Sequence, residues 1–311
     1  MKSLHDCVHE YLAMRRALGF KLKTDERLLR DFAAFMERRH AKRITVKLAI
    51  KWAQQPRSVG SNYHVGRLRA VRSFARYCIL IDPRTEVPSV GLLPRRRCLF
   101  QPHLYSANEV RRLMAACLQR RRAATSISRW TRFTLLGLLS VTGLRVSEAL
   151  NLNMTDVDLD RGVLTIRNSK FGKSRLVPVH PSTCAALRNY LQQRNAYFAG
   201  RPIVPFFVSR YGTRMGHQTL YKTFRILSRK IGLRRPSDRQ EPRLHDLRHS
   251  MAVEVLRRCY RSRTDPEGRL PALATYLGHT NLSYTYWYLH QNPSLMKQAM
   301  TRLEHHWENL P

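Results

Sequence analysis

The chain is 311 residues long and 43% hydrophobic, which is long enough for two domains and too apolar for a disordered protein. Its 56 Lys and Arg residues outnumber 21 Asp and Glu residues, and the formal net charge is +35. Basic residues are in excess both before and after residue 100, so the charge is not confined to one tail. This distribution predicts two basic domains that both bind one polyanion, and nucleic acid is favoured over an anionic membrane as that polyanion.

Cysteine spacing and hydropathy exclude several classes of protein. The cysteines, at positions 7, 78, 98, 117, 184 and 259, form no C-x-x-C pair, which argues against a zinc ribbon or a thioredoxin-like site. The N-terminal MKSLHDCVHEYLAMRR lacks an apolar signal region, and the run FTLLGLLSVTGL is too short to span a membrane. We expect a cytoplasmic, nucleoid-associated protein with no membrane contact, no cofactor and no metal.

Residues 1–90 are predicted to form a helical domain. Apolar residues recur at helical spacing in four segments, residues 4–20, 24–40, 45–56 and 61–80. Thr24 is a candidate N-cap for the second segment, because acidic residues follow it. The polar face of the last segment is basic, and we expect it to contact DNA through Arg67, Arg69 and Arg72.

Residues 91–104 are predicted to link two domains. Prolines and glycine are frequent in and just before this segment, which argues against a regular element. The run Arg95, Arg96 and Arg97 is either a set of contacts to a phosphate backbone or part of a solvated connector. We retain these three arginines as predicted DNA contacts.

Residues 105–311 are predicted to form a second domain, and the whole chain is predicted to be mainly α-helical with one small antiparallel β-sheet. Ser106 and Glu109 have the spacing of a capping box, and Gly143 is a candidate helix end. Two short alternating segments, 162–168 and 174–180, predict a β-hairpin. Residues 202–210 are a candidate for a further strand, and helical patterns occupy 106–121, 130–143, 181–199, 217–231, 242–256 and 271–277.

Three polar clusters among apolar residues are candidates for chemistry. In SVTGLRVSEAL, Arg145 has apolar neighbours and needs an anion, which is either a ligand or Glu148 three residues later. In RLHDLRHSMAVEVL, the basic face of His245, Arg248 and His249 is either solvated or bound to phosphate. In LGHTNLSYTYWYLH, the tyrosines are either core residues or a nucleophile, and their spacing alone does not choose one.

Other chemistries are poorly supported by the sequence. FGKS resembles the end of a P-loop, but Arg167 stands where the first glycine is required. His5 and His9 have zinc-protease spacing without the glutamate. The acidic cluster at 155–160 is either a magnesium site or, as we prefer, a solvated turn.

Several motifs stand in a specific order along the chain. They are TGLRVSEAL, NSKFGKSRLVPV, HDLRHS, LGHTNLS and a tyrosine nine residues after the histidine of the last motif. Over residues 105–290 this series resembles the tyrosine recombinase (phage integrase) family. The resemblance implies a helical core-binding domain that clamps DNA in residues 1–90, and a catalytic domain in residues 105–311. It also implies a site-specific DNA recombinase that uses neither metal nor ATP.

The resemblance assigns roles by position. Glu148 is expected to orient the first arginine, and His249 is a supporting residue. Lys173 is the alternative to Lys170 and is also a predicted DNA contact. Tyr284 and Tyr286 remain alternative nucleophiles. The catalytic residues implied are Arg145, Lys170, His245, Arg248, His279 and Tyr288.

The implied reaction suits these side chains. Two guanidinium groups would neutralise the charge that develops on the phosphate, and the tyrosine would attack phosphorus to form a 3′-phosphotyrosine. His245 would act as a base or proton carrier, and His279 would hydrogen-bond the phosphate. The hairpin lysine would protonate the departing 5′-oxygen.

The last residues predict an amphipathic helix. Its apolar stripe consists of Leu295, Met296, Ala299, Met300 and Leu303. This helix packs either on its own domain or on the next copy in a cyclic homo-tetramer bound to double-stranded DNA. Partner recombinases are also compatible with the sequence.

Two alternative functions remain at this stage. A type IB topoisomerase would share the chemistry without needing a specific site, and an accessory DNA-binding subunit would lack the chemistry altogether. The sequence does not determine the DNA target, or whether a transposon, phage, integron, chromosome or plasmid uses the enzyme.

Overall fold

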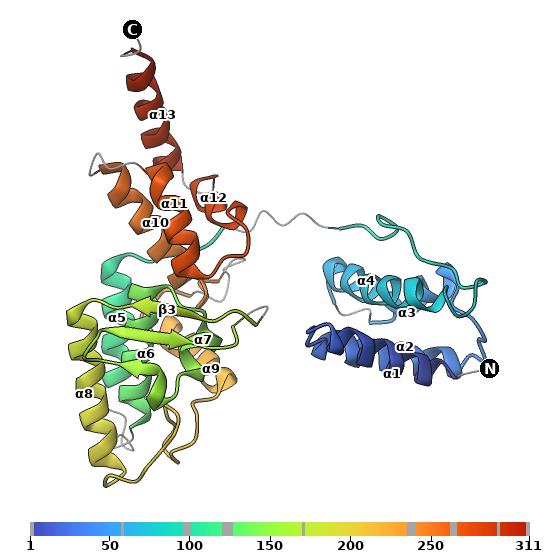
Figure 1. The fold of residues 1–311 in the computed structure, drawn as a ribbon, viewed down its shortest axis with the longest axis horizontal. Coiled ribbons are helices and arrows are strands. Elements are labelled where there is room, and N and C mark those ends of the chain that lie inside the picture. Colours follow the sequence, from blue (N-terminus) through green and yellow to red (C-terminus); the bar gives the residue numbers. More distant parts are fainter. Residues whose placement is uncertain are drawn as a thin grey trace. The chain divides into compact units, whose positions relative to one another are not determined.

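The computed structural model describes residues 3–56, 59–95, 101–119, 127–169, 172–234, 241–261, 266–290 and 293–308. The chain divides into two compact units, Met1–Leu99 and Phe100–Pro311, and the division falls inside the predicted linker (Figure 1). Arg96, Arg97 and Lys170, all predicted functional residues, lie outside the described part of the chain.

The described part of the N-terminal unit is helical, as predicted. Its helices are α1 (Leu4–Ala17), α2 (Lys23–Glu37), α3 (Val46–Ala53) and α4 (Ser61–Cys78). Ser3 and Asp6 form a capping box at the start of α1. The prediction that Thr24 caps α2 is wrong, because α2 already begins at Lys23. Aromatic side chains fill the core between these helices, with Phe32, Trp52 and Phe74 fully buried.

Arg67 corrects one of the predicted DNA contacts. Its side chain is buried in α4, where its guanidinium donates to Asp31 and to the Trp52 carbonyl, both at 3.1 Å. It also stacks on the Trp52 ring at 3.7 Å. The prediction that Arg67 contacts DNA is therefore wrong. It lies one turn before buried Val71, on the apolar side of the helix.

Arg72 also has a structural role in the N-terminal unit. Its guanidinium donates to the carbonyls of Pro88 and Ser89, at 2.6 and 2.7 Å, and fastens the segment after α4. These bonds occupy the group that was expected to contact DNA, so we no longer count Arg72 among the predicted DNA contacts. Arg69 and Arg95 are exposed and keep that prediction.

The C-terminal unit is mainly helical, with the one small antiparallel sheet that was predicted. The sheet has the order β1-β2-β3, with β1 Val157–Asp158, β2 Val163–Ile166 and β3 Arg175–Pro178. β2 and β3 form the predicted hairpin, in which Leu164 pairs with Val177. Residues 202–210 do not form a named strand. They make only isolated bridges, such as that of Val208 with Arg214.

Helices form most of the rest of the unit. α6 contacts α5, α8 and α10, and its leucines are the centre of the main core. The Ser106 capping box starts α5, and Gly143 ends α6 in a left-handed conformation, both as predicted. The helices are α5 (Ala107–Leu118), α6 (Ser128–Thr142), α7 (Val146–Asn151), α8 (Pro181–Tyr197), α9 (His217–Lys230), α10 (Asp246–Arg261), α11 (Pro266–Leu277), α12 (Ser283–His290) and α13 (Pro293–Glu308), with a 3-10 turn at Met154–Asp156.

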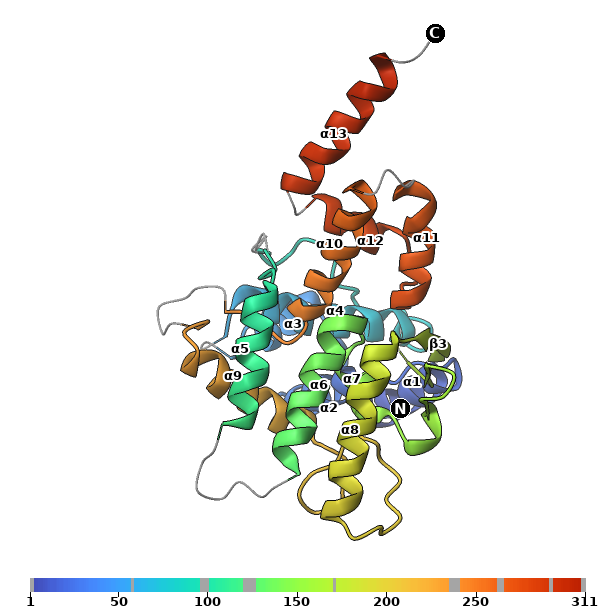
Figure 2. The same ribbon diagram turned by 90° about the vertical axis from the view of Figure 1, so that its left-hand side faces the viewer.

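A smaller apolar cluster joins α10, α11, α12 and the start of α13. It includes Leu256, Leu273, Tyr288 and Leu295. Beyond Leu295, α13 extends away from these helices in both views of the structure (Figures 1 and 2), and Met296 and Met300 are exposed. None of the described helices combines the length and apolar character that a membrane crossing requires.

Candidate active site

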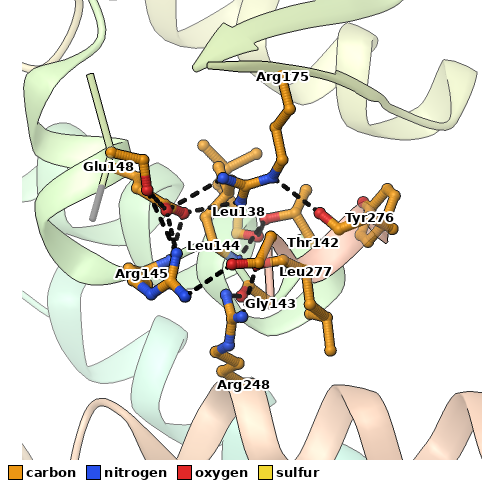
Figure 3. Close-up of polar contacts among 12 residues, drawn as sticks. Leu138, Thr142, Gly143, Leu144, Arg145, Glu148, Arg175, Arg248, Tyr276 and Leu277 are labelled. Atoms are coloured by element: carbon orange, nitrogen blue, oxygen red, sulfur yellow. Dashed lines mark hydrogen bonds and ion pairs between the residues drawn. The ribbon is translucent and has the colours of Figure 1, made fainter. Parts of the chain in front are cut away.

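The first predicted arginine begins a helix directly after a tight turn. Arg145 is the N-cap of α7, and its backbone N–H and Nη1 donate to the two Glu148 oxygens at 3.0 and 2.7 Å. Its Nη2 donates to the Gly278 carbonyl at 3.0 Å (Figure 3). Gly143 allows the end of α11 to come close to Arg145, because Gly143 has φ +60° and a Cβ there would lie 3.1 Å from Leu277.

Glu148 connects three segments of the C-terminal unit. Besides Arg145, its carboxylate accepts hydrogen bonds from Ser169 at 2.5 Å and from Arg175 at 3.0 and 2.8 Å. Burial by itself would raise its pKa, but the bonds from Arg175, Ser169 and the Arg145 backbone lower the pKa to about 2. Glu148 is therefore a buried anion, and the ion pair expected from its spacing is only part of a larger network.

The second predicted arginine is held by backbone carbonyls. Arg248, on α10, is 3% exposed and donates to the carbonyls of Gly143 at 2.8 Å and Leu277 at 2.6 Å (Figure 3). Burial lowers its pKa to about 10, so it stays charged at neutral pH. Leu277 precedes Gly278, the acceptor for Arg145, and this turn therefore brings the two guanidinium groups together.

Only one of the three candidate tyrosines lies against these arginines. Tyr288 is 3% exposed, and its hydroxyl lies beside Arg248, whose charge acts on the pKa of the hydroxyl. Burial raises its pKa, while the positive charge and hydrogen bond of Arg248 oppose the rise. Tyr284 and Tyr286 are 59% and 45% exposed. The Tyr284 ring also lies 6.1 Å from that of His279, but only Tyr288 belongs to the apolar cluster of α10 and α11.

Three histidines complete the surroundings of Tyr288. Its ring lies 5.4 Å from His249 and 6.0 Å from His279, and His245 lies 4.9 Å from His249. Burial and nearby arginines lower the pKa of His279 to about 4, and burial and His245 lower that of His249 to about 3. His245 lies directly before α10, and its pKa is lowered by partial loss of hydration and by the charge of Arg248. Imidazoles with such pKa values are neutral at pH 7.

Some residues of this site were not found by sequence analysis. Buried Thr285 hydrogen-bonds His279 Nδ1 at 2.8 Å, and fully buried Asp246 accepts from the Arg243 N–H at 2.9 Å. Ser169 and Arg175, which bind Glu148, flank the hairpin tip. Arg175 could have been found, because strand alternation places it on the same side of β3 as buried Val177.

The two candidate lysines are not distinguished. Lys173 is exposed, and its carbonyl accepts from the Ser169 N–H at 2.9 Å across the hairpin tip. Lys170 lies outside the described residues. Within the described ranges, no three His, Cys, Asp or Glu side chains are grouped as metal ligands.

Comparison with known proteins identifies the family. Residues 104–294 match the model of the phage integrase family. The chain belongs to this family. A putative integrase/recombinase, y4rB of Sinorhizobium fredii, is 49% identical over 312 residues, which are 99% of each chain. Tyrosine recombinase XerC of Chlamydia caviae is 30% identical over 240 residues, covering 75% of this chain and 69% of that protein.

Solved structures share the fold of this phage integrase family member. The Tn1549 transposon integrase, in complex with transposon right end DNA, matches with a TM-score of 0.69 at 14% identity, over 98% of this chain and 99% of that one. XerH bound to a palindromic difH substrate matches with a TM-score of 0.63 at 21% identity, over 89% and 78%. The predicted family, fold class and enzyme class, DNA strand breakage and rejoining, are confirmed.

Proposed function

We propose that this enzyme is a site-specific recombinase that cuts DNA by forming a 3′-phosphotyrosine on Tyr288, without metal or ATP. The observation that carries the proposal is the position of buried Tyr288 beside Arg248, whose charge acts on the tyrosine hydroxyl, with Arg145 held at the same turn. A phosphodiester placed there would meet a nucleophile and two cations at once.

The proposed step conserves the phosphodiester bond energy. The phenol oxygen of Tyr288 forms a bond to phosphorus, the bond to the 5′-oxygen breaks, and a 5′-hydroxyl leaves. Arg145 and Arg248 stabilise the charge on the nonbridging oxygens. Because the phosphotyrosine keeps the bond energy, a 5′-hydroxyl of another strand can reverse the step and rejoin the DNA.

We assign proton transfer to a neutral imidazole and a lysine. Since burial raises the pKa of Tyr288, its hydroxyl needs an acceptor for its proton, and we propose His245 as base. His279 would hydrogen-bond the phosphate, and His249 would support the tyrosine. Lys170, or Lys173 in its place, would protonate the 5′-oxygen.

Contacts to double-stranded DNA are proposed for exposed basic residues of both units. They include Arg69 in the core-binding domain of residues 1–90, Arg95 at the start of the arginine run, and Lys173. In the C-terminal unit, α9 contacts α7 and exposes Lys222, Arg225 and Arg229 along one face. These side chains suit phosphate binding, which positions DNA without choosing its sequence.

We propose that α13 docks on a neighbouring copy in a homo-tetramer on DNA. Its base packs in cis, because buried Leu295 belongs to the same apolar cluster as Tyr288, whereas Met296 and Met300 are exposed. The double variant Met296→Glu, Met300→Glu should leave cleavage intact and prevent assembly on DNA in sedimentation. Unchanged assembly would refute docking through this surface.

A pool of DNA sequences can test the proposed function without a known target site. The protein is incubated in EDTA with nicked duplexes that carry randomised sequence, and protein-linked DNA is isolated and sequenced. We expect one enriched site, joined to Tyr288. No adduct in EDTA would refute the proposal and favour an accessory subunit, while adducts without sequence preference would favour a topoisomerase.

A further inference from the structure

Arg175 is a charged residue at the centre of the site that has no role in the proposed chemistry. It is the first residue of β3, and its side chain is 12% exposed. Nη1 and Nη2 donate to the two Glu148 oxygens at 3.0 and 2.8 Å, and Nε donates to the Tyr276 carbonyl at 2.9 Å (Figure 3). All three nitrogens of Arg175 thus donate to oxygens of the protein, and its guanidinium is held between Glu148 and the end of α11.

The guanidinium of Arg175 also supports the turn at the end of α11. Gly278 packs against it so closely that a Cβ there would lie 2.8 Å from Arg175 Nη1, and Gly278 has φ +69°. This turn supplies the carbonyls of Leu277 and Gly278, which accept from Arg248 and Arg145 respectively. It also leads directly into His279.

Arg175 therefore contacts both supports of the two phosphate-binding arginines. Glu148 fixes Arg145 from one side, and the turn at 277–278 fixes Arg145 and Arg248 from the other. The Glu148 bonds are charge-assisted and bidentate, a geometry that only an arginine provides. Without Arg175, the Glu148 carboxylate would lose two charge-assisted bonds, and the end of α11 would lose its hydrogen bond from β3.

We propose that Arg175 is a positioning residue that aligns Arg145 and Arg248 on the scissile phosphate, by joining β3, α7 and the end of α11. This rests on the proposed function, because it assumes that the two arginines bind that phosphate. Arg175 acts through them and does not touch DNA.

The experiment compares Arg175→Met and Arg175→Lys with wild type on the duplex recovered from the randomised pool. Arg214→Met is the matched control: Arg214 also donates to backbone carbonyls, those of Leu150 and Leu152, but lies outside the site network. Single-turnover adduct formation is measured with a phosphodiester and with a neutral methylphosphonate at the scissile position. The free energy of unfolding and noncovalent DNA affinity are measured in parallel.

On the phosphodiester, Arg175→Met should slow adduct formation about 10- to 100-fold, the range typical of residues that orient groups contacting a ligand. Arg175→Lys should recover part of the rate, and DNA affinity should be unchanged. On the methylphosphonate the loss should be much smaller, because a substrate without that charge depends less on aligned arginines. Arg214→Met should show equal relative rates on both substrates.

Two outcomes overturn the proposal while wild type still forms its adduct. One is a normal rate for Arg175→Met, and the other is an equal loss on both substrates, which would indicate a general structural defect. If Arg175→Met does not fold, the pair Glu148→Gln, Arg175→Met removes both charges and is held to the same criteria. A wild-type protein without any adduct refutes the proposed function itself.

Discussion

Arg67 in the N-terminal unit and Arg248 in the C-terminal unit are both buried arginines, yet their partners differ. Arg67 is paired with the Asp31 carboxylate and covered by the Trp52 ring. Arg248 donates to two neutral carbonyls and lies beside the Tyr288 phenol, and no ion pair found among the described residues involves it. A carboxylate neutralises a buried cation, whereas carbonyls orient it and leave its charge for an anion. The comparison distinguishes a structural arginine from one that is ready to bind phosphate.

The largest expected effect comes from removing the tyrosine hydroxyl beside Arg248. Tyr288→Phe should abolish the covalent DNA adduct, because no other described tyrosine lies against the arginines. The adduct is measured by denaturing gel electrophoresis, with Tyr284→Phe and Tyr286→Phe as controls that keep it. An adduct formed by Tyr288→Phe would show that another residue is the nucleophile.

Exchanging the two arginines for alanine tests the comparison directly. Arg248→Ala should slow adduct formation by about 10²–10³-fold, the loss typical of one preorganised donor to a developing charge. Arg67→Ala should instead lower the free energy of unfolding by about 1–3 kcal/mol, since it removes hydrogen bonds to a charged group. Rates and denaturant unfolding are measured for both variants. If Arg67→Ala slowed adduct formation without lowering the free energy of unfolding, the distinction between a structural and a phosphate-binding arginine would be wrong.

Burial of the histidines, together with the positive charge around Arg248, also predicts a pH dependence of stability. The folded pKa values of His279 and His249, about 4 and about 3, lie below the usual 6.5, so the unfolded chain binds protons first as the pH falls. The free energy of unfolding should be highest above pH 6.5. It should decrease on acidification towards pH 4, by at most about 1.4 kcal/mol per pH unit for each histidine.

Denaturant unfolding at several pH values measures this slope. The double variant His249→Asn, His279→Asn should flatten it, since the groups that take up protons on unfolding are gone. A slope equal to that of wild type would place the pH dependence elsewhere.

The smallest expected effect comes from replacing Arg69, an exposed neighbour of Arg67 on α4. Exposed Arg69→Ala should weaken DNA binding slightly and reduce the salt dependence of log K by about 0.9, the contribution of one phosphate contact. Its unfolding free energy should not change. Binding titrations at several salt concentrations measure the slope, and a loss of stability without a change in slope would make Arg69 structural as well.

Local patterns in the sequence predicted much of the fold. Helical spacing identified the helices of the first unit, and strand alternation identified the β2–β3 hairpin. The same periodicities could also have placed Arg67 on the apolar side of α4 and Arg175 on the inner side of β3. The failure at Arg67 came from treating every arginine of a basic helix as solvated, although a long guanidinium can be buried when it is paired.

The sequence by itself determined the family, because the order of several short motifs is specific even when each motif is weak. It also determined the candidates for chemistry. Only the tertiary structure decided which tyrosine meets Arg248, and that Ser169, Arg175 and the turn at 277–278 support the arginines. The physical reason is that the interacting residues are far apart along the chain, while periodicity shows only which side of each element is buried. Which charges meet, by contrast, depends on how remote segments pack.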